Sequence, residues 1–408
     1  MLYPPQVKKA IEKLEEQGFE AYIVGGCLRN ILMGKEPHDW DMTTSALPEK
    51  TAEIFRSEGY SVIETGLKHG TVTVLIDGVP LEITTFRIDG EYTDSRHPDS
   101  VTFTRSLSED LARRDFTVNA MAYSEKTGLI DLYGGKADLA KKLLRAVGDP
   151  ERRFTEDALR ILRAFRFSAE HGFKIEEETR KAIIKCRGGL ADISRERIYS
   201  ELYRALTGDF ASVSAAELID CGIMSFIFPF YDEYFAPRTD VLDLLPKRIA
   251  PRLACFIINF NPEEAEKALI SLKMSNADKS AVKSILSAVD LLKNQPFGDV
   301  VSARRFIRLF GENGADAITL ADLLGIDVER AKKAVNIALQ TDFPKSIGDL
   351  AIGGSEVIAL GASGRMTGEI LSFLLEKATE DPTLNTPLGL TELTKKYISE
   401  NKNEHNDH

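Results

Sequence analysis

The chain has 408 residues, of which 43% are hydrophobic and 28% charged, and its formal net charge is −11 at pH 7. This length exceeds what one compact core supports, so we expect two or more folding units. No apolar run approaches the ~20 residues that a membrane-spanning helix needs. The net negative charge argues against indiscriminate coating of nucleic acid, because that mode depends on neutralising many phosphates with Lys and Arg.

The cysteines and the N-terminus exclude further classes of protein. Cys27, Cys186, Cys221 and Cys255 lie far apart without any Cys-x-x-Cys spacing, which suggests neither a disulfide framework nor a zinc site. The first residues lack the charged and apolar regions of a signal peptide, so we expect a cytoplasmic protein.

Two glycines early in the chain indicate a phosphate-binding turn. The apolar run 21–24 predicts a strand, and Gly25 and Gly26 follow it directly, so the strand is expected to enter a tight turn that opens a short helix at 28–33. Glycine lets the backbone approach a phosphate closely, and the amides at the start of a helix point at the anion. Arg29, one turn into the helix, adds charge-assisted contacts.

Asp39 and Asp41 begin the next predicted strand, in which alternate residues share a face. Two carboxylates on one face, close to a phosphate-binding turn, suit Mg²⁺ that is held by protein and nucleotide together. Taken alone, an Asp-x-Asp pair is more often an exposed polar stretch and a Gly-Gly pair more often a loop. Because the two motifs occur together and in this order, a functional site is the favoured interpretation.

The next elements are a predicted helix at 48–58 and then a predicted hairpin, in which the alternating runs 71–76 and 79–86 are joined by an Asp-Gly turn. Glu82 lies among apolar and β-branched residues of the second run, where a carboxylate is costly unless it is exposed or has a partner. It is either an outward-facing strand residue or a third active-site carboxylate. Residues 87–98 are polar and aperiodic and predict a mobile loop.

Arg113, Arg114 and Asp115 follow, where a predicted helix beginning at 109 passes into a strand that ends at Tyr123. Two donors beside an acceptor suit a ribose, whose 2′-OH both donates and accepts. The alternative is a structural ion-pair cluster. A strand at 129–133 and a helix at 137–144 complete the expected mixed sheet.

After Pro150 no convincing strand remains, and amphipathic helices follow. In the first of these helices Asp157 and Arg160 are neighbours at i,i+3, and Arg163 and Arg166 continue the same ridge. A carboxylate accepts from an exocyclic amine while a guanidinium donates to ring nitrogens and carbonyls, so this pair can read a base edge. The alternative is a solvated helix face.

The charge of this region differs from that of the whole chain. Residues 151–210 contain 13 Lys and Arg against 11 Asp and Glu, a net of +2, so the rest of the chain carries −13. The basic residues are therefore concentrated around the predicted base-reading helix. A solvated helix face with ordinary ion pairs would explain the same count.

Three motifs of the chain resemble those of the class II tRNA nucleotidyltransferases, which are polymerase-β-like. The motifs are the Gly-Gly turn followed by Asp-x-Asp, the run Arg-Arg-Asp-Phe-Thr-Val-Asn-Ala and the pattern Glu-Asp-x-x-Arg. This family comprises CCA-adding enzymes and bacterial poly(A) polymerases, and the resemblance covers nearly the whole chain. It implies an α+β fold with a mixed-sheet nucleotidyltransferase head at 1–150. An all-α neck at 151–210 for base recognition, a body at 211–310 and a tRNA-binding tail at 311–408 are implied to follow.

The resemblance also implies the reaction and the residues that perform it. The implied activity is the template-free addition of C, C and A to tRNA 3′ ends from CTP and ATP, with Mg²⁺ held by Asp39 and Asp41 and with Glu82 as the third catalytic carboxylate. The presence of loop 87–98 is implied to distinguish enzymes that add CCA or A from the shortened enzymes that add only CC. The implied nucleotide-binding residues are Gly25, Gly26, Arg29, Arg113, Arg114, Asp115, Asp157, Arg160, Arg163 and Arg166.

Two positions depart from the family pattern. Relatives usually carry Asp where this chain has Asn30, which puts any role of that carboxylate in doubt. The family commonly shows Arg-Arg-Pro at the end of the loop, where this chain has His97 before Pro98. A basic contact of the loop is therefore weakened.

Several alternatives stay open. Within the class, the chain could add only A beside a separate CC-adding enzyme, or it could be a poly(A) polymerase, although 65–74 resembles CCA-adding enzymes and poly(A) polymerases are more basic there. A catalytically silent RNA-binding module is the alternative from another class, and the intact carboxylates speak against it. A phosphohydrolase fusion is disfavoured, because the chain has six histidines and no His-Asp pair in its helical half. The sequence does not define the oligomeric state, and a homodimer is compatible with it.

Overall fold

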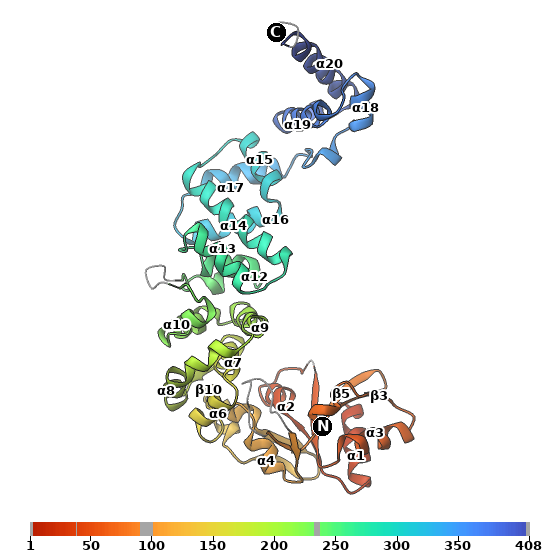
Figure 1. The fold of residues 1–408 in the computed structure, drawn as a ribbon, viewed down its shortest axis with the longest axis vertical. Coiled ribbons are helices and arrows are strands. Elements are labelled where there is room, and N and C mark those ends of the chain that lie inside the picture. Colours follow the sequence, from red (N-terminus) through yellow and green to blue (C-terminus); the bar gives the residue numbers. More distant parts are fainter. Residues whose placement is uncertain (1–2, 38, 90–100, 232–236, 405–408) are drawn as a thin grey trace. The chain divides into compact units, whose positions relative to one another are not determined.

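A computed structural model describes residues 3–37, 39–89, 101–231 and 237–404 of the chain (Figure 1). The chain divides into two compact units. The first consists of residues 1–243 and 259–274, and the second of residues 244–258 and 275–408.

The first unit begins with a seven-stranded mixed sheet of strand order β3-β4-β5-β2-β1-β8-β9. Strands β2 and β5 run parallel, and the other neighbouring strands of this sheet pair antiparallel. The sheet confirms the predicted α+β fold with a mixed-sheet head. Its strands are β1 (Ala21–Val24), β2 (Trp40–Thr44), β3 (Ser61–Ile63), β4 (Thr71–Ile76), β5 (Val79–Thr85), β8 (Met121–Ser124) and β9 (Gly128–Asp131).

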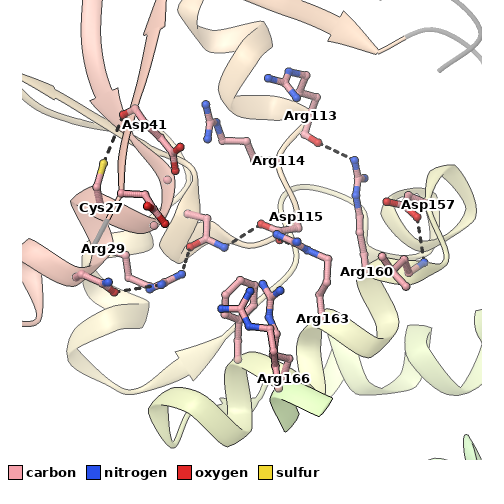
Figure 2. A pocket seen from close by; sticks show the side chains of 18 of the residues that line it. Cys27, Arg29, Asp41, Arg113, Arg114, Asp115, Asp157, Arg160, Arg163 and Arg166 are labelled. Carbon is pink, nitrogen blue, oxygen red and sulfur yellow. Dashed lines mark hydrogen bonds and ion pairs between the residues drawn. The ribbon is translucent and has the colours of Figure 1, made fainter. Parts of the chain in front are cut away.

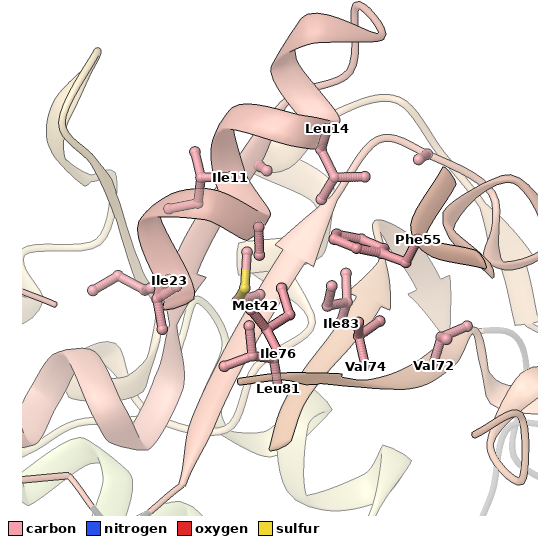
Figure 3. Packing of buried hydrophobic residues seen from close by; sticks show 14 of the residues in the cluster. Ile11, Leu14, Ile23, Met42, Phe55, Val72, Val74, Ile76, Leu81 and Ile83 are labelled. Carbon is pink, nitrogen blue, oxygen red and sulfur yellow. The ribbon is translucent and has the colours of Figure 1, made fainter. Parts of the chain in front are cut away.

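One face of this sheet is covered by α1 (Pro5–Glu16) and α3 (Pro48–Ser57), as Figure 3 shows. Ile11 and Leu14 of α1 and Phe55 of α3 pack there against a buried apolar cluster from the strands. Because side chains alternate along a strand, the residues between these inward positions point to the opposite face. That opposite face carries the polar groups described below. The strand residues that Figure 3 labels in the cluster are Ile23, Met42, Val72, Val74, Ile76, Leu81 and Ile83.

Two short strand pairs lie outside the main sheet and correct the predictions. β6 (Arg87–Asp89) pairs with β7 (Val101–Phe103), so the first three residues of the predicted loop form a strand. The remainder of that loop, 90–98, lies outside the described residues. β10 (Leu143–Leu144) pairs with β11 (Lys174–Ile175), although the sequence predicted no strand after Pro150. Two residues are too few to produce a period-two pattern, which is why the sequence did not reveal β11.

Helices make up the rest of the first unit. α7 packs against both α9 and α10 and carries Arg160, Arg163 and Arg166, whereas Asp157 lies just before it. The helices are α2 (Gly25–Leu32), α4 (Leu107–Ala112), α5 (Gly135–Ala140), α6 (Pro150–Glu156), α7 (Leu159–His171), α8 (Glu177–Cys186), α9 (Arg195–Leu206), α10 (Ala211–Asp220), α11 (Met224–Ile227) and α13 (Pro262–Ser271).

The described residues of the second unit are helical. Its last three helices, α18, α19 and α20, pack around an apolar cluster of their own. In the described part of the chain, no helix is long and apolar enough to cross a membrane. The helices are α12 (Ile249–Phe256), α14 (Asn276–Asn294), α15 (Val300–Phe310), α16 (Glu312–Leu323), α17 (Glu329–Ala338), α18 (Gly354–Ala359), α19 (Arg365–Glu380) and α20 (Pro387–Glu404).

Candidate functional site

A cavity of about 520 Å³ in the first unit brings together the site residues predicted from the sequence, except Glu82 (Figure 2). Its walls come from the start of α2, the start of β2, the segment after α4, and helices α7 and α9. The predicted residues that line it are Gly25, Gly26, Arg29, Asp39, Asp41, Arg113, Arg114, Asp115, Asp157, Arg160, Arg163 and Arg166.

The phosphate-binding element begins directly at the glycines. Helix α2 starts at Gly25, three residues earlier than predicted, because Val24 remains extended and the chain turns at Gly25 with φ of +67°. A Cβ atom at Gly25 would lie 3.3 Å from Nη1 of Arg114 and 3.6 Å from Oδ2 of Asp41. Glycine is therefore required both by the backbone conformation and by the close approach of charged groups. The first amides of α2 lack intrahelical partners and face the same cavity.

Arg29 is buried rather than exposed, with only 6% of its surface accessible. Its Nη1 donates to Oδ1 of Asn119 at 2.6 Å, and its guanidinium lies 5.0 Å from the centre of the Phe167 ring. Burial lowers the pKa of Arg29, while the charge of Asp115 opposes this effect. Among the described residues, its buried Nε has no hydrogen-bond partner, which leaves a donor for an anion at the start of α2.

Asp39 and Asp41 line the cavity beside the glycine turn, and Glu82 lies on the strand next to Asp41 without lining the cavity. Asp41 pairs in register with Glu82 across the parallel strands β2 and β5, so both side chains point to the same face of the sheet. Asp39 lies just before β2, which begins at Trp40 and not at Asp39 as predicted. Burial raises the pKa of Asp41, and the charges of Glu82 and Asp39 raise it further against the opposing effect of Arg114.

This donor set fits a hard divalent cation. Neighbouring carboxylates that repel one another are stabilised by a cation, and Mg²⁺ is usually held by one or two carboxylates with water and substrate phosphates. Across the described ranges, no group of three or more His, Cys, Asp or Glu side chains that could hold a metal ion is found. The carboxylates of Asp39 and Asp41 therefore fit an ion whose remaining ligands come from a bound nucleotide.

Asp115 is saturated by protein donors. Its Oδ1 accepts from the amide of Phe116 at 2.8 Å and from Nδ2 of Asn119 at 3.0 Å, and its Oδ2 accepts from Nη2 of Arg163 at 2.6 Å. Burial alone would raise the pKa of Asp115, but Arg163 and these hydrogen bonds hold it well below its ordinary value. Asp115 therefore forms a structural ion pair that positions Arg163, and because it also lines the cavity its contact with a ribose stays a prediction.

Asp157 does not lie within a helix, which corrects the predicted i,i+3 relation to Arg160. α6 ends at Glu156 and α7 begins at Leu159, and Asp157 between them is extended, with φ of −145° and ψ of 101°. Its Oδ1 accepts from the amide of Leu159 at 3.0 Å, as Figure 2 shows. A short carboxylate that binds a nearby amide competes with helical hydrogen bonding, which explains the break. Burial raises the pKa of Asp157 against the charges of Arg197 and Arg160.

Arg160 and Arg166 of α7 are buried, whereas Arg163 is about one-third exposed, and all three form ion pairs, so this face of α7 is not simply solvated. Nη1 of Arg160 donates to Oε2 of Glu156 at 3.1 Å, and its Nη2 donates to the carbonyl of Arg113 at 3.0 Å. Nη1 of Arg166 lies 3.2 Å from Oε2 of Glu201. The Phe167 ring packs against three guanidiniums, those of Arg29, Arg163 and Arg166, at 5.0, 5.4 and 4.4 Å.

Several residues of the site were not predicted. Arg197 and Arg204 line the cavity from α9, and Nη2 of Arg197 lies 3.7 Å from Oδ2 of Asp157. Arg197, Glu201 and Arg204 follow one another at i, i+4 and i+7, a helical stripe that the sequence contained. Asn119 belongs to the Arg-Arg-Asp run and joins Asp115 to Arg29, but its role depends on a contact across 90 residues that no local pattern reveals.

Comparison with known proteins relates the chain to one group of enzymes. Residues 21–145 match the family described as Poly A polymerase head domain, and residues 172–235 match the one described as Probable RNA and SrmB- binding site of polymerase A. A CCA-adding enzyme of Leuconostoc mesenteroides is 35% identical over 399 residues, which is 96% of each chain.

Solved structures agree with this relation. The Bacillus stearothermophilus CCA-adding enzyme in complex with CTP matches with a TM-score of 0.83 and 30% identity, covering 98% of this chain and 100% of that one. The Thermotoga maritima CCA-adding enzyme complexed with tRNA shares the fold, with a TM-score of 0.69 and 22% identity, covering 96% of this chain and 95% of that one.

Proposed function

The chain belongs to the family of CCA-adding enzymes, and on that premise we propose that it adds C, C and A to the 3′ ends of tRNA in the cytoplasm, from CTP and ATP and without a nucleic-acid template. The observation that carries this proposal is the single cavity that joins the carboxylates Asp39 and Asp41, the glycine turn of α2 and Asp157. A nucleotidyltransferase needs these three parts within the reach of one nucleotide.

The carboxylates Asp39 and Asp41, with Glu82 beside them, would hold a divalent cation, which we propose to be Mg²⁺. When bound, such an ion activates the terminal ribose hydroxyl and stabilises the leaving pyrophosphate. Burial of Asp41 and its position opposite Glu82 keep two oxygen donors aimed at one place. The residues of the chain thus supply positioning before the reaction begins.

The triphosphate is held by the start of α2 in this proposal. The amides of Gly25 and Gly26 and the buried guanidinium of Arg29 provide donors on one side of the cavity. Arg113 and Arg114 line the cavity from the segment after α4 and bind the ribose and the phosphates. Because Arg29 is buried and the side chains of Arg113 and Arg114 are only 16% exposed, their interaction with a polyphosphate is stronger than that of fully solvated cations.

Base selection is assigned to the break between α6 and α7. Cytosine and adenine both present an exocyclic amine beside a ring acceptor, whereas uracil and guanine present a carbonyl where the amine would be. Asp157 accepts from the amine, and Arg160, which lines the same wall, is the proposed donor to the ring acceptor. One pocket can therefore accept CTP and ATP and reject the other two nucleotides.

The test is nucleotide incorporation into three tRNA transcripts that lack one, two or all three terminal nucleotides. We expect CTP to extend the two shorter transcripts and ATP to complete the transcript that ends in CC, with synthesis ending after one A. Extension of only the transcript ending in CC would identify an A-adding enzyme that works with a separate CC-adding enzyme. Continued A addition would identify a poly(A) polymerase, and no incorporation would leave an RNA-binding module.

A further inference from the structure

Helix α4 places a fully buried carboxylate, Asp110, directly beneath the two arginines of the cavity. Its side chain is 0% exposed. Oδ1 accepts from Nε and Nη2 of Arg113 at 3.0 and 2.8 Å, and Oδ2 accepts from Nη2 of Arg114 at 3.1 Å. Both arginines line the cavity, so one carboxylate fixes the direction of both guanidiniums.

The same carboxylate is bound to β2, the strand that carries Asp41. Oγ1 of Thr43 donates to Oδ2 of Asp110 at 3.2 Å, and the amide of Arg87 donates to Oδ1 at 3.4 Å. Thr43 follows Asp41 by two positions on β2, so their side chains share a face of the sheet. Asp110 therefore links the arginines to the strand of Asp41 and to the first residue of β6.

The C-terminal end of α4 is bound to the base-reading segment. The carbonyl of Ala112 accepts from Nη1 of Arg153 at 3.1 Å, and the carbonyl of Arg113 accepts from Nη2 of Arg160 at 3.0 Å. Carbonyls at a helix C-terminus lack intrahelical partners and are satisfied well by cationic donors. Arg153 belongs to α6 and Arg160 to α7, the helices on either side of Asp157.

Asp110 is held in its charged form. Burial by itself raises the pKa of its carboxyl, but Arg114 and Arg113 hold that pKa below its ordinary value. A buried charge that loses its partner is strongly destabilising, and neutralising this carboxylate would leave two guanidiniums without their common counter-charge. Those guanidiniums would then reorient toward the other carboxylates of the cavity.

We propose that Asp110 is a positioning residue for nucleotidyl transfer, which keeps the arginine pair, the strand of Asp41 and the segment of Asp157 in one fixed relation. This inference rests on the proposed function. Asp110 does not line the cavity, so it acts through Arg113 and Arg114. A displacement of the reacting groups by about 1 Å costs about 100-fold in rate.

The test compares Asp110→Asn with the wild type on tRNA ending in CC and on tRNA lacking all three nucleotides. We expect kcat/KM to fall about 100-fold for ATP and CTP alike, with KM at least about tenfold higher, because the arginines bind ribose and phosphate rather than the base. Asp110→Glu retains the charge and should recover part of this loss. Asp316→Asn is the matched control, because Asp316 is also a buried carboxylate paired with an arginine, Arg248, but lies in the second unit. It should leave both KM values unchanged.

A KM and kcat of Asp110→Asn within about twofold of the wild type would overturn the proposal, whatever the change in melting temperature. If Asp110→Asn does not fold, Thr43→Val decides, because it removes the hydroxyl that lies 3.2 Å from both Oδ2 of Asp110 and the carbonyl of Thr84 and leaves the two ion pairs of Asp110 intact. An unchanged KM in Thr43→Val would then overturn the proposal, because it would show that the strand of Asp41 does not depend on its link to Asp110. A measurement of CTP binding without tRNA distinguishes a failure of the positioning role from a failure of the proposed function. If the wild type does not extend tRNA, the proposed function is wrong. Weaker CTP binding by Asp110→Asn would still support the positioning role in that case.

Discussion

Asp41 on β2 and Glu82 on β5 lie opposite each other in the register of two parallel strands, with both side chains on the sheet face opposite the apolar core. Glu82 is exposed, whereas Asp41 lines the cavity, and the charge of Glu82 helps to raise the pKa of Asp41. A cation between the strand ends and a phosphate would relieve this repulsion. The first two predictions follow from this relationship.

Asp39→Ala and Asp41→Ala should each abolish incorporation of both CTP and ATP while tRNA binding is largely retained, because these carboxylates serve the reaction rather than docking. The expected loss is at least ~10³-fold in kcat. Single-turnover incorporation and a tRNA filter-binding assay measure the two effects. Glu49→Ala removes an exposed carboxylate of α3 and should behave as the wild type. Near-normal turnover of either Asp variant in Mg²⁺ would show that the metal assignment is wrong.

Glu82→Gln should retain part of the activity but require more Mg²⁺. The substitution removes one of the charges that attract a cation, and it lowers the pKa of Asp41 because a repulsive neighbour is lost. We expect the Mg²⁺ concentration for half-maximal rate to rise several-fold, with kcat at saturating Mg²⁺ lowered less than in Asp41→Ala. An unchanged Mg²⁺ titration would leave Glu82 as an outward-facing strand residue without a role in metal binding.

Asp157→Ala should lose more discrimination than catalysis. Against Asp157, uracil would place an acceptor opposite an acceptor, a mismatch of about 1 to 3 kcal/mol, which corresponds to about 5- to 150-fold in selectivity. We would measure incorporation of all four nucleotides on tRNA that lacks the three terminal residues. Asp157→Asn is the informative companion, because its amide both donates and accepts and should admit UTP. Selectivity equal to that of the wild type in both variants would exclude Asp157 from base reading.

His171 should make the protein less stable as the pH falls. Burial, together with the charges of Arg29, Lys35, Arg166 and Arg204, lowers the pKa of His171 from 6.5 to about 3. Between these values the unfolded chain binds a proton that the folded protein does not, so stability is complete above about pH 6.5 and is lost as the pH falls toward 3. At about pH 5 this group alone should cost about 2 kcal/mol of the free energy of unfolding.

His171→Phe tests this, because the ring already stacks on Phe167 at 6.1 Å and packs against Phe173 at 5.3 Å. Urea unfolding near pH 7.5 and near pH 5 should show a smaller loss of stability in the variant than in the wild type. Equal losses of stability between the two pH values in both proteins would mean that His171 is protonated in the folded protein or does not contribute to the pH dependence of stability.

Local patterns were sufficient to predict the elements and many of the cavity residues. The apolar run before Gly25, the alternation around Glu82 and the helical spacing of apolar residues predicted the mixed sheet and the helices after it, because these patterns arise from contacts within a few residues. The motif that contains Asp39 and Asp41 and the Arg-Arg-Asp run identified segments that line the cavity. Element boundaries shifted by a few residues, as at Gly25, where backbone conformation outweighed the pattern.

The partners of the charged side chains could not be predicted in this way. Asp115 and Arg163 are 48 residues apart, and Arg29 and Asn119 are 90 apart, so only the fold shows that Asp115 orients Arg163 and that Asn119 accepts from Arg29. Arg160, the proposed donor to the base, also donates to the carbonyl of Arg113, a partner 47 residues away that its spacing could not reveal. Asp110 looked like an ordinary helical acid until Thr43, Arg113 and Arg114 were found around it. Period and spacing follow from the local backbone, whereas burial and the pairing of charges depend on which distant segments the fold brings together.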